Sequence, residues 1–138
     1  MHVIHTQNEL IKTLKTLTPI AFVPTMGNLH EGHIKLIQEA LKKTKHIVVS
    51  IFINPLQFNS KEDFKNYPRT LEKDLSMLEG LNVPYVFVPS EEDILDQQKQ
   101  PKFIYPPLQM ICVGNLGQAI LMVLPLLYVN YLPSLSPI

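Results

Sequence analysis

The sequence predicts an α/β fold in which a parallel sheet carries helices on both faces. One pattern in the sequence leads to this class. Short apolar runs rich in β-branched residues alternate with amphipathic, helix-length segments over residues 1–95. This alternation is typical of right-handed β-α-β crossovers, which build parallel sheets. Ligands of such sheets bind beyond the carboxyl ends of the strands, so the segments that follow each strand are the places to look for a site.

The first elements are a helix and a strand. Thr6-Gln7-Asn8-Glu9 has the pattern of a capping box, in which the Thr6 hydroxyl accepts from a backbone N–H and Glu9 reaches back. The helix that it opens has one apolar stripe, made of Leu10, Ile11, Leu14 and Leu17. The apolar run 20–23 then predicts a buried strand that Pro24 breaks.

The later elements repeat this order. A helix is predicted from about Glu31, a central strand over 46–53, a helix over 70–79 and a strand over 85–88, with a helix start at 90–93. The helix over 70–79 is expected to turn Leu71, Leu75 and Leu78 inward, with Gly80 as the first residue after its end.

Composition excludes several classes of protein. Lys plus Arg equals Asp plus Glu, so the net charge is zero and a nucleic-acid partner is not expected. The single cysteine, Cys112, excludes an internal disulfide and fits a reducing compartment. The first residues lack the pattern of a signal peptide. We therefore expect a soluble cytoplasmic protein with no membrane partner.

The stretch after the first core strand, Pro24-Thr25-Met26-Gly27-Asn28-Leu29-His30-Glu31-Gly32-His33, is the most informative one. Glycines let the backbone approach a ligand, and a helix start with unpaired N–H groups favours phosphate. His30 and His33 are three residues apart, so both imidazoles are expected on one side, in reach of triphosphate oxygens. The alternatives are a structural or solvated histidine pair and, less favoured, a metal site, because no further ligand lies suitably nearby.

Three motifs then resemble one enzyme family. VPTMGNLHEGH (23–33) resembles the ATP-binding signature of pantothenate synthetases, the pantoate–β-alanine ligases, which belong to the HxGH nucleotidyltransferase superfamily. VSIFINPLQF (49–58) and EDFKNYPRT (62–70) resemble the next two segments of that family, in the same order and spacing. The resemblance covers about residues 1–105 and implies a Rossmann-like nucleotidyltransferase domain.

The resemblance also implies a reaction and its residues. ATP, with Mg²⁺, activates pantoate as pantoyl adenylate, and β-alanine then displaces AMP. The ATP site would consist of Met26, Gly27, Asn28, Leu29, His30, Glu31, Gly32 and His33. His33 would be the catalytic proton donor, and Gln57 would contact pantoate and β-alanine. No resident metal ligand is implied, and the family forms homodimers. Two roles remain possible for Arg69: it could contact an anion, or it could form a structural ion pair with Glu72 or Asp74.

The end of the chain departs from the family. All 12 basic and 12 acidic residues lie at or before Lys102, and an uncharged, proline-rich tail follows. When the codons from Met110 onward are reread from their third base, permitted synonymous choices spell DLCGKFRPGHFDG, the family's next segment. We therefore divide the chain into an incomplete domain over 1–109 and a frame-shifted tail over 110–138, with the family's C-terminal domain absent. The alternatives are a membrane anchor over 111–129 or a native C-terminal strand pair.

These observations predict ATP-dependent condensation of pantoate with β-alanine, weak or absent in this truncated chain alone. Two other classes stay open. One is a different small-molecule nucleotidyltransferase, since the HxGH pattern (30–33) occurs in many of them. The other is a non-catalytic remnant of a disrupted gene.

Overall fold

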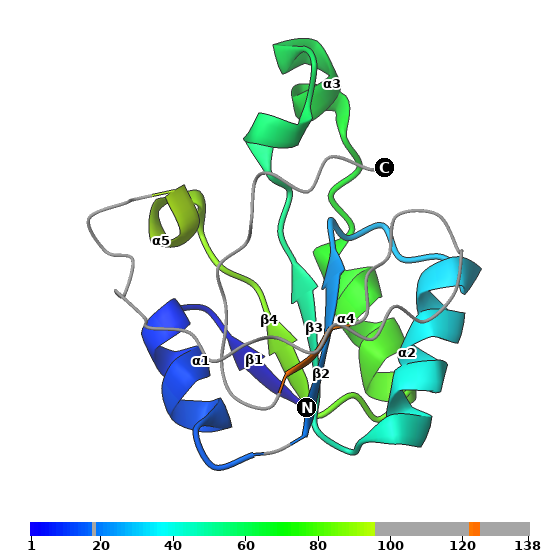
Figure 1. The fold of residues 1–138 in the computed structure, drawn as a ribbon. Coiled ribbons are helices and arrows are strands. Elements are labelled where there is room, and N and C mark those ends of the chain that lie inside the picture. The colour runs from blue at the N-terminus through cyan, green and yellow to red at the C-terminus, as the bar shows by residue number, and fades with distance from the viewer. Residues whose placement is uncertain (18, 96–121, 125–138) are drawn as a thin grey trace.

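The computed structural model describes residues 1–17, 19–95 and 122–124. Within them the elements run β1 (His2–Ile4), α1 (Gln7–Leu14), β2 (Ile20–Thr25), α2 (Glu31–Lys43), β3 (Ile47–Ile51), the 3₁₀ turn η1 (Pro55–Gln57), α3 (Lys61–Asn66), α4 (Leu71–Gly80), β4 (Tyr85–Phe87), α5 (Glu91–Leu95) and β5 (Met122–Leu124). The strands form one sheet in the order β1-β4-β3-β2-β5. β1 to β4 are parallel, which confirms the predicted α/β class (Figure 1).

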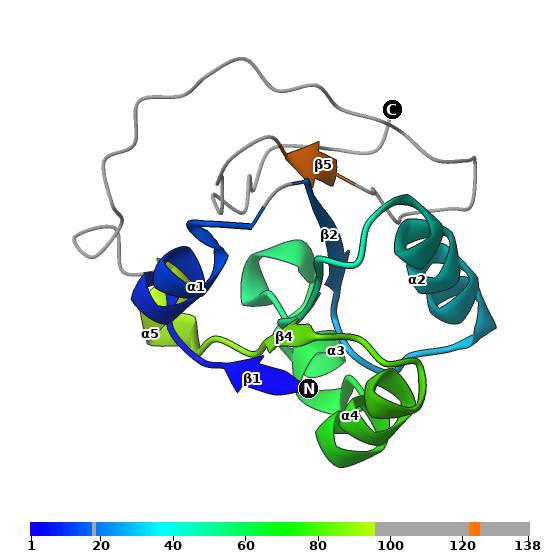
Figure 2. The same ribbon diagram turned by 90° about the horizontal axis from the view of Figure 1, so that it is seen from below.

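The helices cover both faces of this sheet, as predicted. On one face, α2 and α4 pack on the strands through a cluster that includes Ile37, Ala40, Val49, Leu78 and Val86. On the other face, α1 and α5 pack through a second cluster, which includes Ile4, Leu10, Leu14, Phe52 and Ile94. Figure 2 shows the two helix layers with the sheet between them. All five residues of β3 are buried, because this strand lies in the middle of the sheet.

Strand β2 does not end before Pro24, which corrects the sequence prediction. The N–H of Ala21 donates to the carbonyl of His46, and the carbonyl of Thr25 accepts from Phe52, so alternate residues of β2 bond to β3. Pro24 lies between these positions and faces away from β3, where its missing N–H breaks no bond of that ladder. On the side of β2 that faces away from β3, β5 is the neighbouring strand. Within the described residues it pairs only with residues 20–22 and so does not reach Pro24.

The N-terminal segment contains a strand that the sequence analysis missed. β1 has three residues and pairs with β4 at the edge of the sheet. The helix after it begins as predicted, because Thr6 Oγ1 accepts from Glu9 N at 3.2 Å. The reciprocal half of the capping box is different, since the Glu9 carboxylate accepts from the N–H of His5.

Helix α4 also differs in detail from its prediction. Leu78 is fully buried and Leu75 packs against the core, but Leu71 is 39% exposed. Gly80 is the last helical residue, not the residue after the helix. The left-handed residue that follows is Asn82 (φ 58°), so Gly80 provides no left-handed cap.

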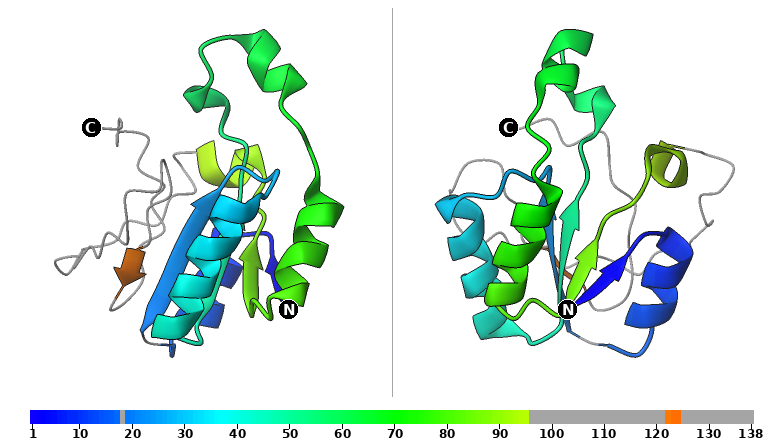
Figure 3. Two further views of the ribbon diagram at one scale, coloured as in Figure 1. Left: turned by 90° about the vertical axis from the view of Figure 1, so that its right-hand side faces the viewer. Right: turned by 180° about the vertical axis from the view of Figure 1, so that it is seen from behind.

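The segment between β3 and α4 rises beyond the carboxyl ends of the strands. It contains η1 and α3, a short helix with no buried residue that the sequence analysis also missed. Figure 3 shows α3 standing above the sheet, clear of both helix layers. Edge-to-face ring contacts stabilise this segment, with the Phe58 centroid 5.4 Å from those of Phe64 and Tyr67. We call residues 55–70 the arm.

The proposed tail lies almost entirely outside the described residues. Only β5 is described, and it adds antiparallel to the edge formed by β2. Among the described residues, no helix has the length and apolar character needed to cross a membrane. The proposed anchor segment 111–129 falls mostly outside that range, so it stays an untested alternative.

Candidate active site

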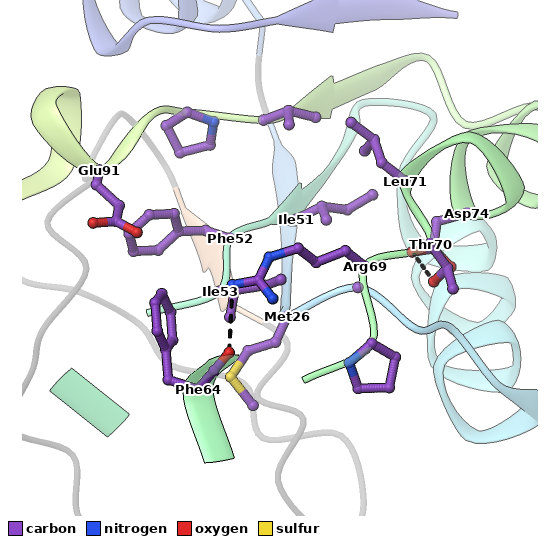
Figure 4. A pocket seen from close by; sticks show the side chains of 14 residues that line it. Met26, Ile51, Phe52, Ile53, Phe64, Arg69, Thr70, Leu71, Asp74 and Glu91 are labelled. Atoms are coloured by element: carbon purple, nitrogen blue, oxygen red, sulfur yellow. Dashed lines mark hydrogen bonds between the residues drawn. The ribbon is translucent and has the colours of Figure 1, made fainter. Parts of the chain in front are cut away.

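A pocket of about 290 Å³ opens where three parallel strands end. The residues after β2, β3 and β4 form its floor, and the arm and the start of α4 form its wall (Figure 4). Its described lining is Met26, Gly27, Ile51, Phe52, Ile53, Phe64, Pro68, Arg69, Thr70, Leu71, Asp74, Val88, Pro89 and Glu91. The pocket therefore lies where the topology rule predicts a ligand, and most of its lining is apolar.

The turn after β2 has an unusual backbone. Gly27 (φ 77°) and Asn28 (φ 51°) are both left-handed. This places the N–H groups of Asn28 and Leu29 2.9 Å from the two carboxylate oxygens of Asp74. A Cβ at position 27 would lie 3.1 Å from Oδ2 of Asp74 and 3.2 Å from Ile51, so the turn requires glycine for both conformation and space.

The two predicted histidines lie together at the start of α2. Their ring centroids are 4.1 Å apart, which confirms that both imidazoles lie on the same side. His30 is the N-cap, and its Nδ1 accepts from the N–H of Gly32 at 3.1 Å. Nδ1 of His33 accepts from the N–H of His30 at 3.4 Å. The two side chains thus form a reciprocal capping box made of imidazoles.

This arrangement corrects the expectation of an open helix start. The backbone N–H groups of His30 and Gly32 already donate to imidazole nitrogens, so they are not free for phosphate. A ring nitrogen that accepts from an N–H carries no proton, so in the neutral state each ring has its proton on Nε2. The side-chain donors that this helix start offers to an anion are therefore the two Nε2–H groups.

The pKa of His33 lies below its ordinary value of 6.5. Burial of the half-buried ring is the main cause, and the neighbouring His30 lowers the pKa further. The carboxylate of Asp74 acts in the opposite direction and raises it. At neutral pH His33 is therefore a neutral imidazole that donates through Nε2.

The structure does not bring every predicted site residue into the pocket. Met26 and Gly27 line it, whereas His30 and His33 are not part of its described lining. Gln57 is exposed on η1, and its N–H donates to the carbonyl of Asn54.

Arg69 lines the pocket but pairs with neither Glu72 nor Asp74. Its guanidinium donates to the carbonyls of Phe64, Lys65 and Tyr67 at 3.2–3.3 Å and lies 5.2 Å from the Phe64 ring centroid. Arg69 therefore caps the carboxyl end of α3, which is a structural role different from the ion pair considered from the sequence.

Asp74 is the residue that the sequence analysis missed. It is only 1% exposed, whereas the sequence suggested only a surface partner for Arg69. The signal for burial was its spacing on α4, since Asp74 shares a helix face with Leu78 and Leu71. A charged residue on an apolar stripe points to a buried partner, and here the partner is the turn after β2.

Comparison with known proteins identifies the family. The family model described as pantoate-beta-alanine ligase matches residues 2–120. The chain belongs to the pantoate–β-alanine ligase family. Among similar proteins, the pantothenate synthetase of Neisseria meningitidis serogroup C is 49% identical over 107 residues, which are 78% of this chain and 38% of that protein. The pantothenate synthetase of Vibrio cholerae is 56% identical over 97 residues, 69% of this chain and 33% of that protein.

Solved ligases of this family share the fold. The Francisella tularensis pantoate–β-alanine ligase, complexed with beta-gamma ATP and beta-alanine, superimposes with a TM-score of 0.68 at 39% identity, covering 78% of this chain and 42% of that one. The Thermus thermophilus pantothenate synthetase gives a TM-score of 0.64 at 33% identity, covering 83% of this chain and 38% of that one. The chain thus spans about two fifths of the length of these family members.

Proposed function

We propose that this chain carries the ATP-binding half of a site that condenses pantoate with β-alanine. The observation that carries the proposal is the imidazole pair at the start of α2, in a member of the pantoate–β-alanine ligase family. Within residues 1–17, 19–95 and 122–124, neither Nε2–H group has a hydrogen-bond acceptor. The apolar pocket at the strand ends lies directly beside the turn that leads into this helix. Binding of ATP to the related Francisella enzyme supports the same assignment.

In the first proposed step, a carboxylate oxygen of pantoate attacks the α-phosphorus of ATP. The bond from this phosphorus to the oxygen that bridges to the β-phosphorus breaks, and pyrophosphate leaves. Negative charge grows on the leaving oxygens, where Nε2–H of His30 and His33 would stabilise it. We also assign His33 as proton donor to the leaving pyrophosphate. The triphosphate charge raises the pKa of a nearby imidazole, so the ring would take up a proton at Nδ1, release the N–H of His30 and pass its Nε2 proton to the pyrophosphate.

In the second proposed step, the amine of β-alanine attacks the acyl carbon of pantoyl adenylate. The acyl C–O bond breaks, AMP leaves, and the amine loses a proton as the amide forms. We assign Gln57 to contact both substrates, since a side-chain amide offers a donor and an acceptor without charge. In the present structure Gln57 lies outside the pocket lining, so this role requires the arm to move toward the floor.

Magnesium is proposed only as the counter-ion of ATP. Among residues 1–17, 19–95 and 122–124, no three His, Cys, Asp or Glu side chains are grouped so as to hold a metal ion. We therefore assign no step to a resident metal. The ion would enter on the phosphate oxygens of ATP.

We expect the condensation to be slow in this chain by itself. The family's RPGHF-type and SSRN-type segments do not occur among its 138 residues. Oxyanion donors from such segments matter, because loss of one such donor typically costs about 10²–10³ in rate.

The test is pantoate-dependent AMP formation by the purified full chain, together with an ATP titration. We expect ATP binding and slow AMP formation that needs pantoate, and His33→Ala should abolish the latter. His46→Ala, which removes an imidazole at the opposite end of β3, is the matched control and should keep wild-type activity. Unchanged activity in His33→Ala would contradict the site assignment. Pyrophosphate release without pantoate would favour another nucleotidyltransferase, and absence of ATP binding with uncooperative melting would favour a non-catalytic remnant.

A further inference from the structure

Asp74 is a buried carboxylate with three donors. It is 1% exposed, and its oxygens accept from Asn28 N at 2.9 Å, Leu29 N at 2.9 Å and Thr70 Oγ1 at 3.0 Å. Burial of a charge is costly unless hydrogen bonds compensate it, and here they come from two different elements. Thr70 is the N-cap of α4, yet its hydroxyl makes no cap bond and serves the carboxylate instead.

The turn that Asp74 contacts has the geometry of an anion nest. Gly27 and Asn28 are both left-handed, and the turn that they form directs the successive N–H groups of Asn28 and Leu29 to one carboxylate. In many nucleotide-binding proteins such a concavity holds a phosphate. In this chain the side-chain carboxylate of Asp74 occupies this concavity. It packs so closely on Gly27 that a Cβ added to Gly27 would lie 3.1 Å from Oδ2 of Asp74.

We propose that Asp74 is the positioning residue of this site: it occupies the nest of the 27–29 turn in place of a substrate phosphate. The turn leads directly into the N-cap His30, so its conformation fixes where α2 begins. With the nest filled and the N–H groups of His30 and Gly32 capped, the Nε2–H groups of His30 and His33 are the side-chain donors left for the triphosphate. This inference rests on the proposed function for its ATP-binding part only.

The charge of Asp74 acts on the same helix start. Its carboxylate raises the pKa of His33, against the effects of burial and of His30. Asp74 thus holds the turn in place and keeps His33 closer to its protonated form.

The experiment is chemical rescue of Asp74→Ala in the full chain. This variant removes the carboxylate and leaves space beside two N–H groups and the Thr70 hydroxyl. Formate is the size of the missing group, so sodium formate should raise the thermal midpoint of Asp74→Ala and restore its ATP affinity, which we expect to fall roughly tenfold. Sodium gluconate, too large for the space, controls for ionic strength. Glu72→Ala, an exposed acid on the same helix, is the matched control and should show neither the loss nor a response to formate.

A second variant covers the case in which Asp74→Ala does not fold. Asp74→Asn keeps the shape, but its NH₂ faces a backbone N–H, so the amide protons of Asn28 and Leu29 should move upfield in the NMR spectrum. Unshifted amide protons, or a formate response equal to that of Glu72→Ala, would overturn the inference. The amide shifts and the effect of formate on the thermal midpoint need no ATP. A wild-type chain that fails to bind ATP would therefore refute the proposed function, while the formate response still decides the role of Asp74.

Discussion

The imidazole of His30 lies over the backbone of Gly32 and accepts its N–H at 3.1 Å. A Cβ at position 32 would lie 2.9 Å from Cε1 and 3.1 Å from Nδ1 of that ring. The backbone of Gly32 is not left-handed, so glycine is needed here for space and not for conformation. The glycine of the His-x-Gly-His pattern therefore has a steric reason: it lets the first imidazole fold back and cap the helix.

The first prediction is that Gly32→Ala lowers the affinity for ATP and leaves the free energy of unfolding nearly unchanged. Alanine pushes the His30 ring away and breaks its cap bond, which costs about 1 kcal/mol. Alanine also favours the helix by about 0.5–1 kcal/mol, so the free energy of unfolding should change little. The ATP affinity should nevertheless fall, because Nε2 of His30 is displaced. Urea unfolding and an ATP titration measure the two quantities.

Gly80→Ala is the matched control for this variant. Gly80 is also helical, its backbone is not left-handed, and a Cβ added there would have no atom within 4 Å. We expect the substitution to stabilise the chain by up to about 1 kcal/mol and to leave ATP affinity unchanged. Equal ATP affinity in Gly32→Ala and Gly80→Ala would show that the position of the His30 ring does not matter for binding.

The second prediction concerns pH. The pKa of His33 is lower in the folded chain than its ordinary 6.5, mainly because of burial. Between these two pKa values the unfolded state binds more protons than the folded state, so stability rises with pH. The contribution of His33 is complete above about pH 6.5 and is lost as the pH falls toward the folded pKa. Urea unfolding at a series of pH values should show this decline.

His33→Asn tests whether His33 causes this decline. Asparagine keeps an acceptor for the N–H of His30 but does not titrate, so this part of the pH dependence should disappear. His46→Asn removes an imidazole elsewhere and should keep the decline. The same pH profile in both variants would assign the effect to another group.

Much of the fold could be predicted because its signals are local. The β-branched run at β3 and the apolar stripes of α1 and α2 indicate both element type and buried face. β1 and α3 were missed for physical reasons: β1 has three residues, and α3 buries none of its side chains. Pro24 was misjudged because its tolerance depends on which neighbour its missing N–H would have faced.

The site was only partly predictable for a similar reason. The spacing of His30 and His33 predicts their shared side, since it follows from helix geometry alone. The pairing of each Nδ1 with a backbone N–H depends on rotamers, and the contact of Asp74 with the 27–29 turn joins residues 45 and 46 positions apart. Such contacts arise only once α4 packs on the sheet and meets the turn that follows β2.

The third prediction concerns the gene. The proposed tail lies largely outside the described residues, so the nucleotide sequence is the measurement that decides its origin. We expect the bases that start at the third position of codon 110 to spell an RPGHF-type segment and to continue in that frame. Any other reading would contradict the frame change and favour a native tail. The strand β5, at 122–124, would then be a selected element of the sheet.

The last prediction is that Arg69 stabilises the arm as a local unit. Its guanidinium bonds to three carbonyls at the end of α3 and stacks on Phe64, while α3 buries no residue of its own. Arg69→Ala should therefore cost about 1 kcal/mol, most of it as local opening. Amide hydrogen exchange should become faster over 61–66 and stay unchanged in β2 and β3.

Lys65→Ala is the control for Arg69→Ala, because it removes an exposed cation from the same helix but leaves the carbonyl contacts in place. Its amide exchange should match that of the wild-type chain. If Arg69 instead held an anion in the pocket, Arg69→Ala would weaken ATP binding and leave exchange over 61–66 unchanged. The structure favours the first result, because the guanidinium donates to carbonyls of the arm from its place in the pocket wall (Figure 4).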